Sequence, residues 1–184
     1  MIYSLSLATA SCLAGLLLLL LGAVAWFAPR PTVPWLKAFP RSRGWGIGLL
    51  VLAAGWAWEL IRIIDLSEFD SWRPKLLILI PVAAVLTALY VEEMLAVRAL
   101  GMVVLLAAEP LLEAAFLRPE TSRLFLVVFT YLAIVAAMFW IGMPYVLRDH
   151  LRWLTEVPRR LRLVALGAGV YGALLLILGL TLHR

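Results

Sequence analysis

Apolar residues run in six stretches of roughly membrane length, separated by short segments that hold most of the charge. A helix of about 20 apolar residues crosses the hydrocarbon of a bilayer, so each stretch predicts a transmembrane helix. We therefore expect an all-α, polytopic membrane bundle that forms a single domain over residues 1–184. The expected spans are residues 5–28, 44–64, 76–91, 99–117, 124–147 and 161–182.

The third and fourth spans are the least clearly separated. One unbroken helix over residues 76–117 would be about 63 Å long, twice the hydrocarbon thickness, so a break is required. The polar residues Glu92, Glu93 and Arg98 mark the expected turn, and they make the two spans a tight hairpin. Because both helices would be short, either could instead be re-entrant, which would bring the acids of this region around one cavity.

Charge predicts the orientation of the chain. Both connectors rich in arginine and lysine are expected on the cytoplasmic side, and this requires an even number of crossings between them. Six spans with both termini outside satisfy that condition, in a membrane that we expect to be the bacterial inner membrane. The cations are Arg30, Lys37, Arg41 and Arg43 in residues 29–43, and Arg148, Arg152, Arg159, Arg160 and Arg162 in residues 148–162.

The two connectors share the pattern Trp-Leu, three residues, Pro-Arg. Indole rings settle at the headgroup level and arginines face the inner headgroups, so these residues are expected to anchor the chain at the interface. An internal duplication would also explain the match, although any cytoplasmic hairpin favours the same residue types. The expected anchors are Trp35, Arg41, Arg43, Trp153, Arg159 and Arg160.

Each connector is expected to lie in the plane of the interface. Leu147, Leu151 and Leu154 recur at helical spacing, which predicts a short amphipathic helix. In the first connector, four prolines at positions 29, 31, 34 and 40 are expected to exclude a regular helix. The connectors could bind anionic lipid or a cytoplasmic partner, but membrane anchoring alone is the favoured interpretation.

Small residues spaced four apart predict close helix packing. The second and last spans carry such pairs, so we expect these two helices to pack against each other or across an oligomer interface. The pairs are Gly44 with Gly48, Ala165 with Gly169, and Ala168 with Gly172.

Two acids stand inside the fourth span. Glu109 lies near its middle and Glu113 follows one turn later on the same face, where an ionised carboxylate in hydrocarbon is costly. Glu59, Arg62 and Asp65 share one face at the end of the second span, at a similar expected depth. We therefore predict an intramembrane polar pocket in which Arg62 is the counter-ion of Glu113 and Glu59, although such a pair can also serve only to orient two helices.

The amino terminus has a second interpretation. Residues 13–21 resemble the apolar core of a signal peptide, and residues 23–25 fit a cleavage site, but the preceding residues carry no positive charge. Cys12 is the one cysteine, so an intrachain disulfide is excluded and we expect a thiol that packs between helices.

The sequence has few residues or motifs that are typical of catalytic, metal or cofactor sites. Hydrophobic residues make up 65% of the chain and mean hydropathy is +1.02, whereas the net charge of +5 sits mostly in the two connectors and does not indicate a nucleic-acid partner. There are two histidines, His150 and His183, no asparagine or glutamine, and no HExxH, GxSxG or phosphate-loop motif. No catalytic residue, metal site or cofactor is predicted, and enzymatic activity is disfavoured.

Three functions agree with these features. The first is an accessory or structural subunit that packs against other membrane chains or copies of itself. The second is a small oligomeric transporter or a cation or proton channel that uses Glu109 and Glu113. The third is a lipid-binding or lipid-modifying membrane protein, open to the bilayer near the acidic pocket. Membrane lipids are expected partners in all three cases.

Overall fold

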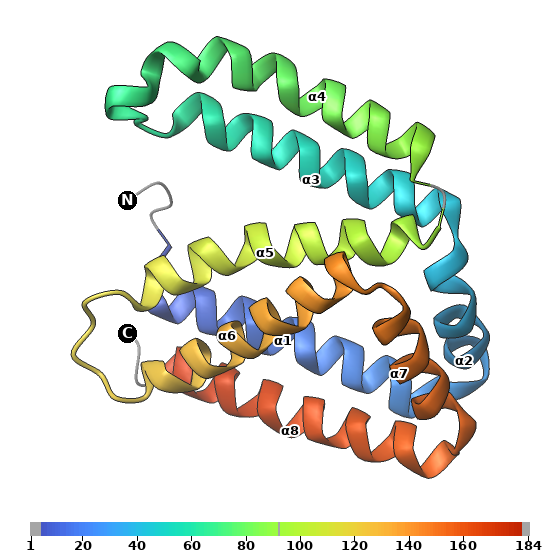
Figure 1. Ribbon diagram of the computed structural model, residues 1–184. Helices are drawn as coiled ribbons and strands as arrows, with labels where there is room; N and C mark the ends of the chain where they lie inside the picture. The colour runs from blue at the N-terminus through green and yellow to red at the C-terminus, as the bar shows by residue number, and fades with distance from the viewer. Residues whose placement is uncertain (1–4, 92, 182–184) are drawn as a thin grey trace.

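The computed structural model describes residues 5–91 and 93–181, and over these ranges every regular element is a helix (Figure 1). Six of the helices described here are long and apolar enough to cross a membrane. The α-helices are α1 Leu7–Phe27, α2 Pro29–Ala38, α3 Arg43–Ile63, α4 Arg73–Tyr90, α5 Leu95–Ala115, α6 Arg123–Gly142, α7 Tyr145–Glu156 and α8 Pro158–Thr181, with 3-10 segments η1 Phe39–Arg41 and η2 Ser67–Trp72.

Helices α1 and α8 form the most extensive packed pair of the bundle, and they run antiparallel (Figure 1). Their backbones approach at glycines: a Cβ added to Gly15 would lie 2.7 Å from the carbonyl oxygen of Gly172, and the reverse distance is the same. Gly179 packs in the same way against Cys12, which is the helix-packing thiol expected from the sequence. This contact makes α1 a member of the bundle core.

Helix α5 lies between α3 and α6 and carries the most buried stretch of the chain, beginning at Leu95. Small residues again permit the contacts. A Cβ on Gly46 of α3 would lie 2.9 Å from the backbone nitrogen of Ala96, and one on Gly101 would lie 3.0 Å from the carbonyl oxygen of Ala137 in α6. Helices α3 and α6 therefore both pack closely on α5, with backbone in contact with backbone.

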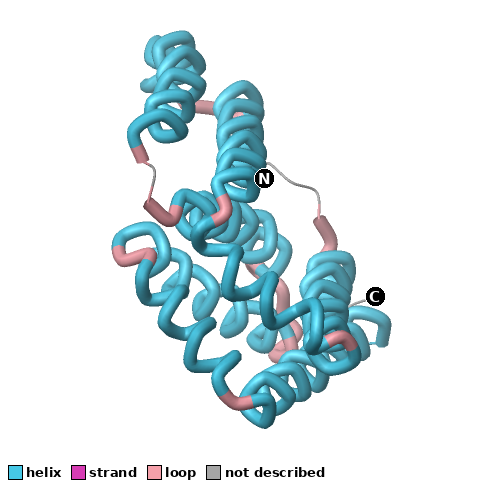
Figure 2. Tube along the Cα trace, turned by 90° about the vertical axis from the view of Figure 1, so that its right-hand side faces the viewer, coloured by secondary structure: helices cyan, strands magenta, loops and turns pink. Residues whose placement is uncertain are grey.

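Helices α3 and α4 form a hairpin at one side of the bundle (Figures 1 and 2). The buried residues of α3 are Gly46, Leu50 and Ala53, all in its first half, and no residue of α4 is buried. The turn from α4 to α5 is short, as expected, but α4 packs mainly on α3, so the expected tight pairing of the third and fourth spans holds only at that turn.

The fourth span begins earlier than the sequence suggested. Met94 has a left-handed backbone (φ 54°) and α5 starts at the next residue, so Arg98 lies inside the helix rather than in the turn. The helix also ends at Ala115, which places Glu109 about 9 Å from its end instead of near its middle.

The connector helices α2 and α7 lie side by side at one end of the bundle (Figure 1). Helix α7 has the amphipathic character expected from its leucines, with Leu147 buried and Asp149, His150 and Arg152 exposed.

The expectation that proline excludes a regular helix from the first connector was wrong, because α2 is an α-helix. Pro29 and Pro31 lie in its first turn, where amide hydrogens have no acceptor within the helix, so nothing is lost there. Pro34 removes a single hydrogen bond, and Pro40 lies beyond the α-helix in η1.

Within the chain, α8 packs on α1, not on α3; the alternative, a contact of these helices across an oligomer interface, stays a prediction. Ala165 and Gly172 face α1, whereas a Cβ added to Gly44 or Gly48 of α3 would meet no atom within 4 Å. The duplication of the two connectors stays a hypothesis.

The contact between α1 and α8 predicts opposite effects of alanine at two glycines of α8. Gly172→Ala should lower the free energy of unfolding by about 1–3 kcal/mol, because its Cβ would meet the backbone of α1. Gly167→Ala meets nothing within 4 Å and should be neutral or stabilise by up to about 1 kcal/mol through helix propensity. Thermal unfolding in detergent measures both, and equal stabilities would contradict the packing described here.

Candidate functional site

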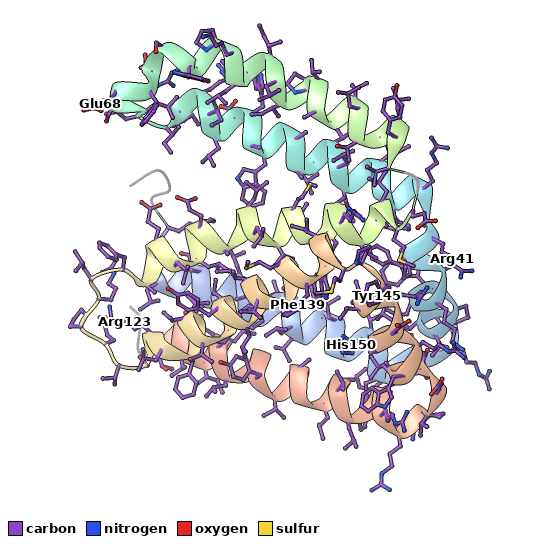
Figure 3. All side chains as sticks on the ribbon, in the orientation of Figure 1. Arg41, Glu68, Arg123, Phe139, Tyr145 and His150 are labelled. Atoms are coloured by element: carbon purple, nitrogen blue, oxygen red, sulfur yellow. The ribbon has the colours of Figure 1, made fainter. Side chains whose placement is uncertain are left out.

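Charged side chains gather at both ends of the bundle (Figure 3). Arg41, Tyr145 and His150 lie at the end formed by α2 and α7, and Glu68 and Arg123 lie at the opposite end. We call these the connector end and the far end. The residues singled out in the sequence divide between them, and each group has its own geometry.

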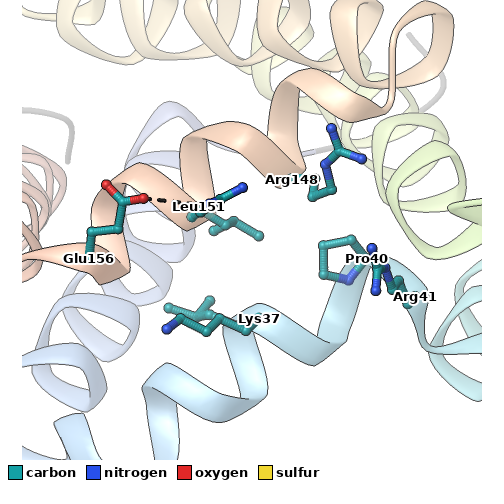
Figure 4. Close-up of a pocket in the computed structure, with 8 residues that line it drawn as sticks. Lys37, Pro40, Arg41, Arg148, Leu151 and Glu156 are labelled. Atoms are coloured by element: carbon teal, nitrogen blue, oxygen red, sulfur yellow. Dashed lines mark ion pairs between the residues drawn. The ribbon is translucent and has the colours of Figure 1, made fainter.

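The connector end holds a groove between α2 and α7 with a volume of about 570 Å³ (Figure 4). We call it the basic groove. Of the predicted anchors only Arg41 lines it, and Lys37, Arg148 and Arg152 supply the other positive charges, with Glu156 as the one acid. Arg43 and Arg159 are exposed outside its lining.

Two of the arginines on α7 have carboxylate partners. Arg148 Nε donates to Asp149 Oδ1 at 2.8 Å, and this hydrogen bond lowers the pKa of the Asp149 carboxyl and raises the pKa of the guanidinium. Arg152 lies 3.5 Å from Glu156. Both members of the Arg148–Asp149 pair are therefore charged at neutral pH.

The predicted tryptophan anchors lie at the surface of the connector end. Trp35 packs edge-on against Trp45 at 5.8 Å and also contacts Phe39, which is itself buried against α5. Trp153 is covered on one side by the guanidinium of Arg160, 4.6 Å from the ring centre. Both indoles remain about half exposed, as residues at a headgroup boundary would be.

The acids of α5 open onto a separate pocket of about 600 Å³ near the far end. Glu109 and Glu113 line it together with apolar side chains of α5 and Ile134 of α6. Oε2 of Glu109 is buried and has no hydrogen-bond partner among the described residues. The predicted pairing of these two carboxylates on one face is therefore present.

The predicted counter-ion Arg62, and Glu59 and Asp65 that were grouped with it, lie outside the lining of this pocket. Arg62 bonds Glu59 at 2.8 Å on the surface of α3, where both side chains are about half exposed, and its guanidinium also stacks on Trp58. Asp65 accepts a hydrogen bond from the amide of Ser67 and so belongs to the turn after α3. None of the three lines the pocket of Glu109, so the expected bond from Arg62 to Glu113 stays a prediction.

The predicted turn between the third and fourth spans is only partly described. Glu92 lies outside the described residues, and Glu93 is exposed. Arg98 is half-buried in the first turn of α5, and its Nε is buried without a hydrogen-bond partner in the described part of the chain. The sequence placed Arg98 in solvent, and the early start of α5 moves it toward the bundle.

Arginines that close helix ends were missed by sequence reasoning. Arg73, the first residue of α4, donates to the carbonyl oxygens of Ile61, Arg62 and Ile64 at 3.1, 2.7 and 2.9 Å. Arg123, the first residue of α6, binds the carbonyl of Ala115 at the end of α5, and Arg160 binds that of Trp153 in α7. In each case an arginine in the first turn of one helix donates to carbonyl groups at the end of the preceding helix. An arginine directly after a polar loop is the sequence signal that could have predicted these caps.

No described residues combine into a metal site, since no three histidine, cysteine, aspartate or glutamate side chains in this part of the chain are grouped to hold an ion. The chemistry on offer is anion binding in the basic groove, and proton or cation binding at the Glu109–Glu113 pocket.

The Arg73 cap gives a direct prediction. Arg73→Ala should destabilise the hairpin by about 2 kcal/mol, because three carbonyl groups at the end of α3 lose a charged donor. Amide hydrogen exchange in the last turn of α3 should then be faster. Lys75→Ala, which removes a cation stacked on Trp72 at the surface, is the matched control and should leave exchange in α3 unchanged. Equal exchange in both variants would rule out the cap.

The chain has no match among protein-family models, curated proteins or solved structures, so its functional assignment rests on the geometry above.

Proposed function

We propose that this protein is an accessory membrane subunit that packs laterally against a transmembrane helix of another chain through the outward face of α3. Gly44, Gly48 and Gly55 carry this proposal. At 100° per residue they lie within about 40° of one another on α3, and a Cβ added to any of them meets no atom within 4 Å. Small residues of this kind are what membrane helices use to approach another helix closely.

The direction of this glycine face supports the proposal. Gly46, Leu50 and Ala53, which pack toward α5, lie on the opposite side of α3. Val51 belongs to the glycine face and is 65% exposed. The face therefore points away from the protein's own bundle, and the glycines serve no contact within the chain.

The charged pair at the end of α3 extends the same face. Arg62 follows Gly44 by five turns of helix, and with Glu59 it forms a half-exposed ion pair. A partner helix along the glycine face would cover this pair, and polar groups within a span are a common means of fixing such a contact.

Crosslinking in native membranes tests the proposal. Val51→Cys, in a chain whose Cys12 is replaced by alanine, should form a discrete adduct with a thiol-reactive crosslinker. Gly48→Ile should reduce the adduct several-fold, because a branched side chain fills the hollow that the partner backbone occupies. Val170→Cys on α8, which is 63% exposed, is the matched control and should give no discrete adduct.

The mass of the adduct identifies the partner. If the added mass differs from the 20.4 kDa of this chain, the partner is another protein, and the accessory role is supported. A doubled mass indicates self-association instead, and equal crosslinking at positions 51 and 170 would contradict a specific α3 interface.

The pocket of Glu109 and Glu113 favours a second candidate, a proton or cation pathway. Its distinguishing observation is the buried Glu109 oxygen without a hydrogen-bond partner in the described chain, since such a group needs a proton, an ion or water. Glu109→Gln should then abolish proton or cation flux in liposomes while leaving thermal stability unchanged. Glu59→Gln on the surface of α3 is the control, and flux that survives Glu109→Gln would eliminate this candidate.

A further inference from the structure

The basic groove is built from two helices of the same charge. Lys37 and Arg41 come from α2 and η1 (Figure 4), and Arg148 and Arg152 of α7 line the same groove. The two helices touch despite this like charge. A bound anion would offset the repulsion that their approach creates.

Two of these cations are left without a carboxylate. Arg148 is hydrogen-bonded to Asp149 and Arg152 lies near Glu156, whereas Lys37 and Arg41 have no acidic partner in the described part of the chain. Residues 29–43 contain no acid at all. Lys37 and Arg41 both line the groove, and an ammonium and a guanidinium suit a phosphate, which accepts bidentate hydrogen bonds from arginine and binds lysine as a point charge.

An apolar groove of about 700 Å³ adjoins the basic one. It lies along α1 and α8 under α2, and Leu36 lines both grooves. Its walls on α8 extend from Leu161 to Ala168, which is roughly 10 Å along the helix. The hydroxyl of Thr32, which lines this groove, donates to the carbonyl of Ala28 at 2.6 Å.

We propose that these adjoining grooves form a site for one anionic phospholipid. The phosphate of the headgroup binds Lys37 and Arg41 in the basic groove, and an acyl chain passes Leu36 and lies in the apolar groove between α1 and α8. Trp35 and Trp153, exposed at the same end, mark the headgroup level at which the phosphate sits.

The apolar groove is what selects a lipid over a soluble anion. A free phosphate or an acidic peptide would use the cations but would leave the apolar groove beside its site unfilled. Zwitterionic phospholipids carry the same phosphate together with a cation, which the positive groove repels. The site is therefore specific for net negative headgroups with a hydrocarbon tail.

Native mass spectrometry of the full-length protein released from micelles tests the headgroup. With phosphatidylglycerol and phosphatidylcholine of the same acyl chains, phosphatidylglycerol should be retained preferentially. The double variant Lys37→Ala with Arg41→Ala should weaken phosphatidylglycerol binding roughly thirtyfold, since two basic contacts are lost. The control pair Arg30→Ala with Arg162→Ala removes the same charge from exposed positions outside both grooves and should change binding less than threefold.

A second pair of variants tests the acyl chain independently of the headgroup. Ala25→Phe fills the apolar groove and should reduce lipid retention about tenfold, whereas Ala23→Phe, two residues away on the exposed face of α1, should not. This comparison remains decisive if the double charge variant fails to fold.

Three results would overturn the proposal. Equal losses in the two charge variants would show general surface attraction. Equal retention in Ala25→Phe and Ala23→Phe would show that no acyl chain occupies the groove. Displacement of the lipid by glycerol 3-phosphate at equal concentration would show a site for soluble anions.

Discussion

Helices in a bilayer gain little from hydrophobic association, because lipid tails are as apolar as leucine, so close contact between backbones must hold them together. In this protein that contact is made between α1 and α8, where Gly15 and Gly172 bring each backbone against the other's carbonyl. The connector end depends on it. Helix α2 begins directly after α1 and α7 leads directly into α8, so packing α1 on α8 brings the two connectors together and creates both grooves. If α1 and α8 separated, the basic groove would open with them.

Helix ends pose a second problem in this environment, because their last carbonyl groups have no partners within the helix. Arg73, Arg123 and Arg160 solve it with the first turn of the next helix. Two of them, Arg73 and Arg123, lie at the far end and donate to backbone carbonyls there. The cations of the basic groove are different, because Lys37 and Arg41 have no such task in the described chain. This separates structural arginine from arginine that can bind a ligand, a distinction that counting charges in loops does not make.

The six helices long enough to cross a membrane followed from apolar length, and the amphipathic helix α7 followed from its leucine spacing. Other features could not be predicted from the local sequence. The prolines of α2 were overrated as breakers, because proline in a first turn costs nothing. The start of α5 depends on a left-handed turn at Met94, a residue type that gives no signal for it. Because α5 also ends at Ala115, Glu109 lies past the middle of the helix, toward its end, where a charge costs less than at midspan, and this weakens the argument that a counter-ion must exist.

The small residues of α3 and α8 show what the sequence alone could not predict. Gly44 and Gly48 have the spacing typical of helix contact, and so do Ala165 and Gly169. The spacing identifies a face that permits close approach, but it contains no information about the partner. In the folded chain Ala165 is used internally against α1, whereas Gly44 and Gly48 of α3 meet open space, and only the arrangement of the helices distinguishes the two cases. A glycine in an internal contact stabilises the bundle. A glycine without such a contact lowers the stability of its own helix, and no contact inside the chain offsets that loss. Such a face is the one that the proposed partner helix would use.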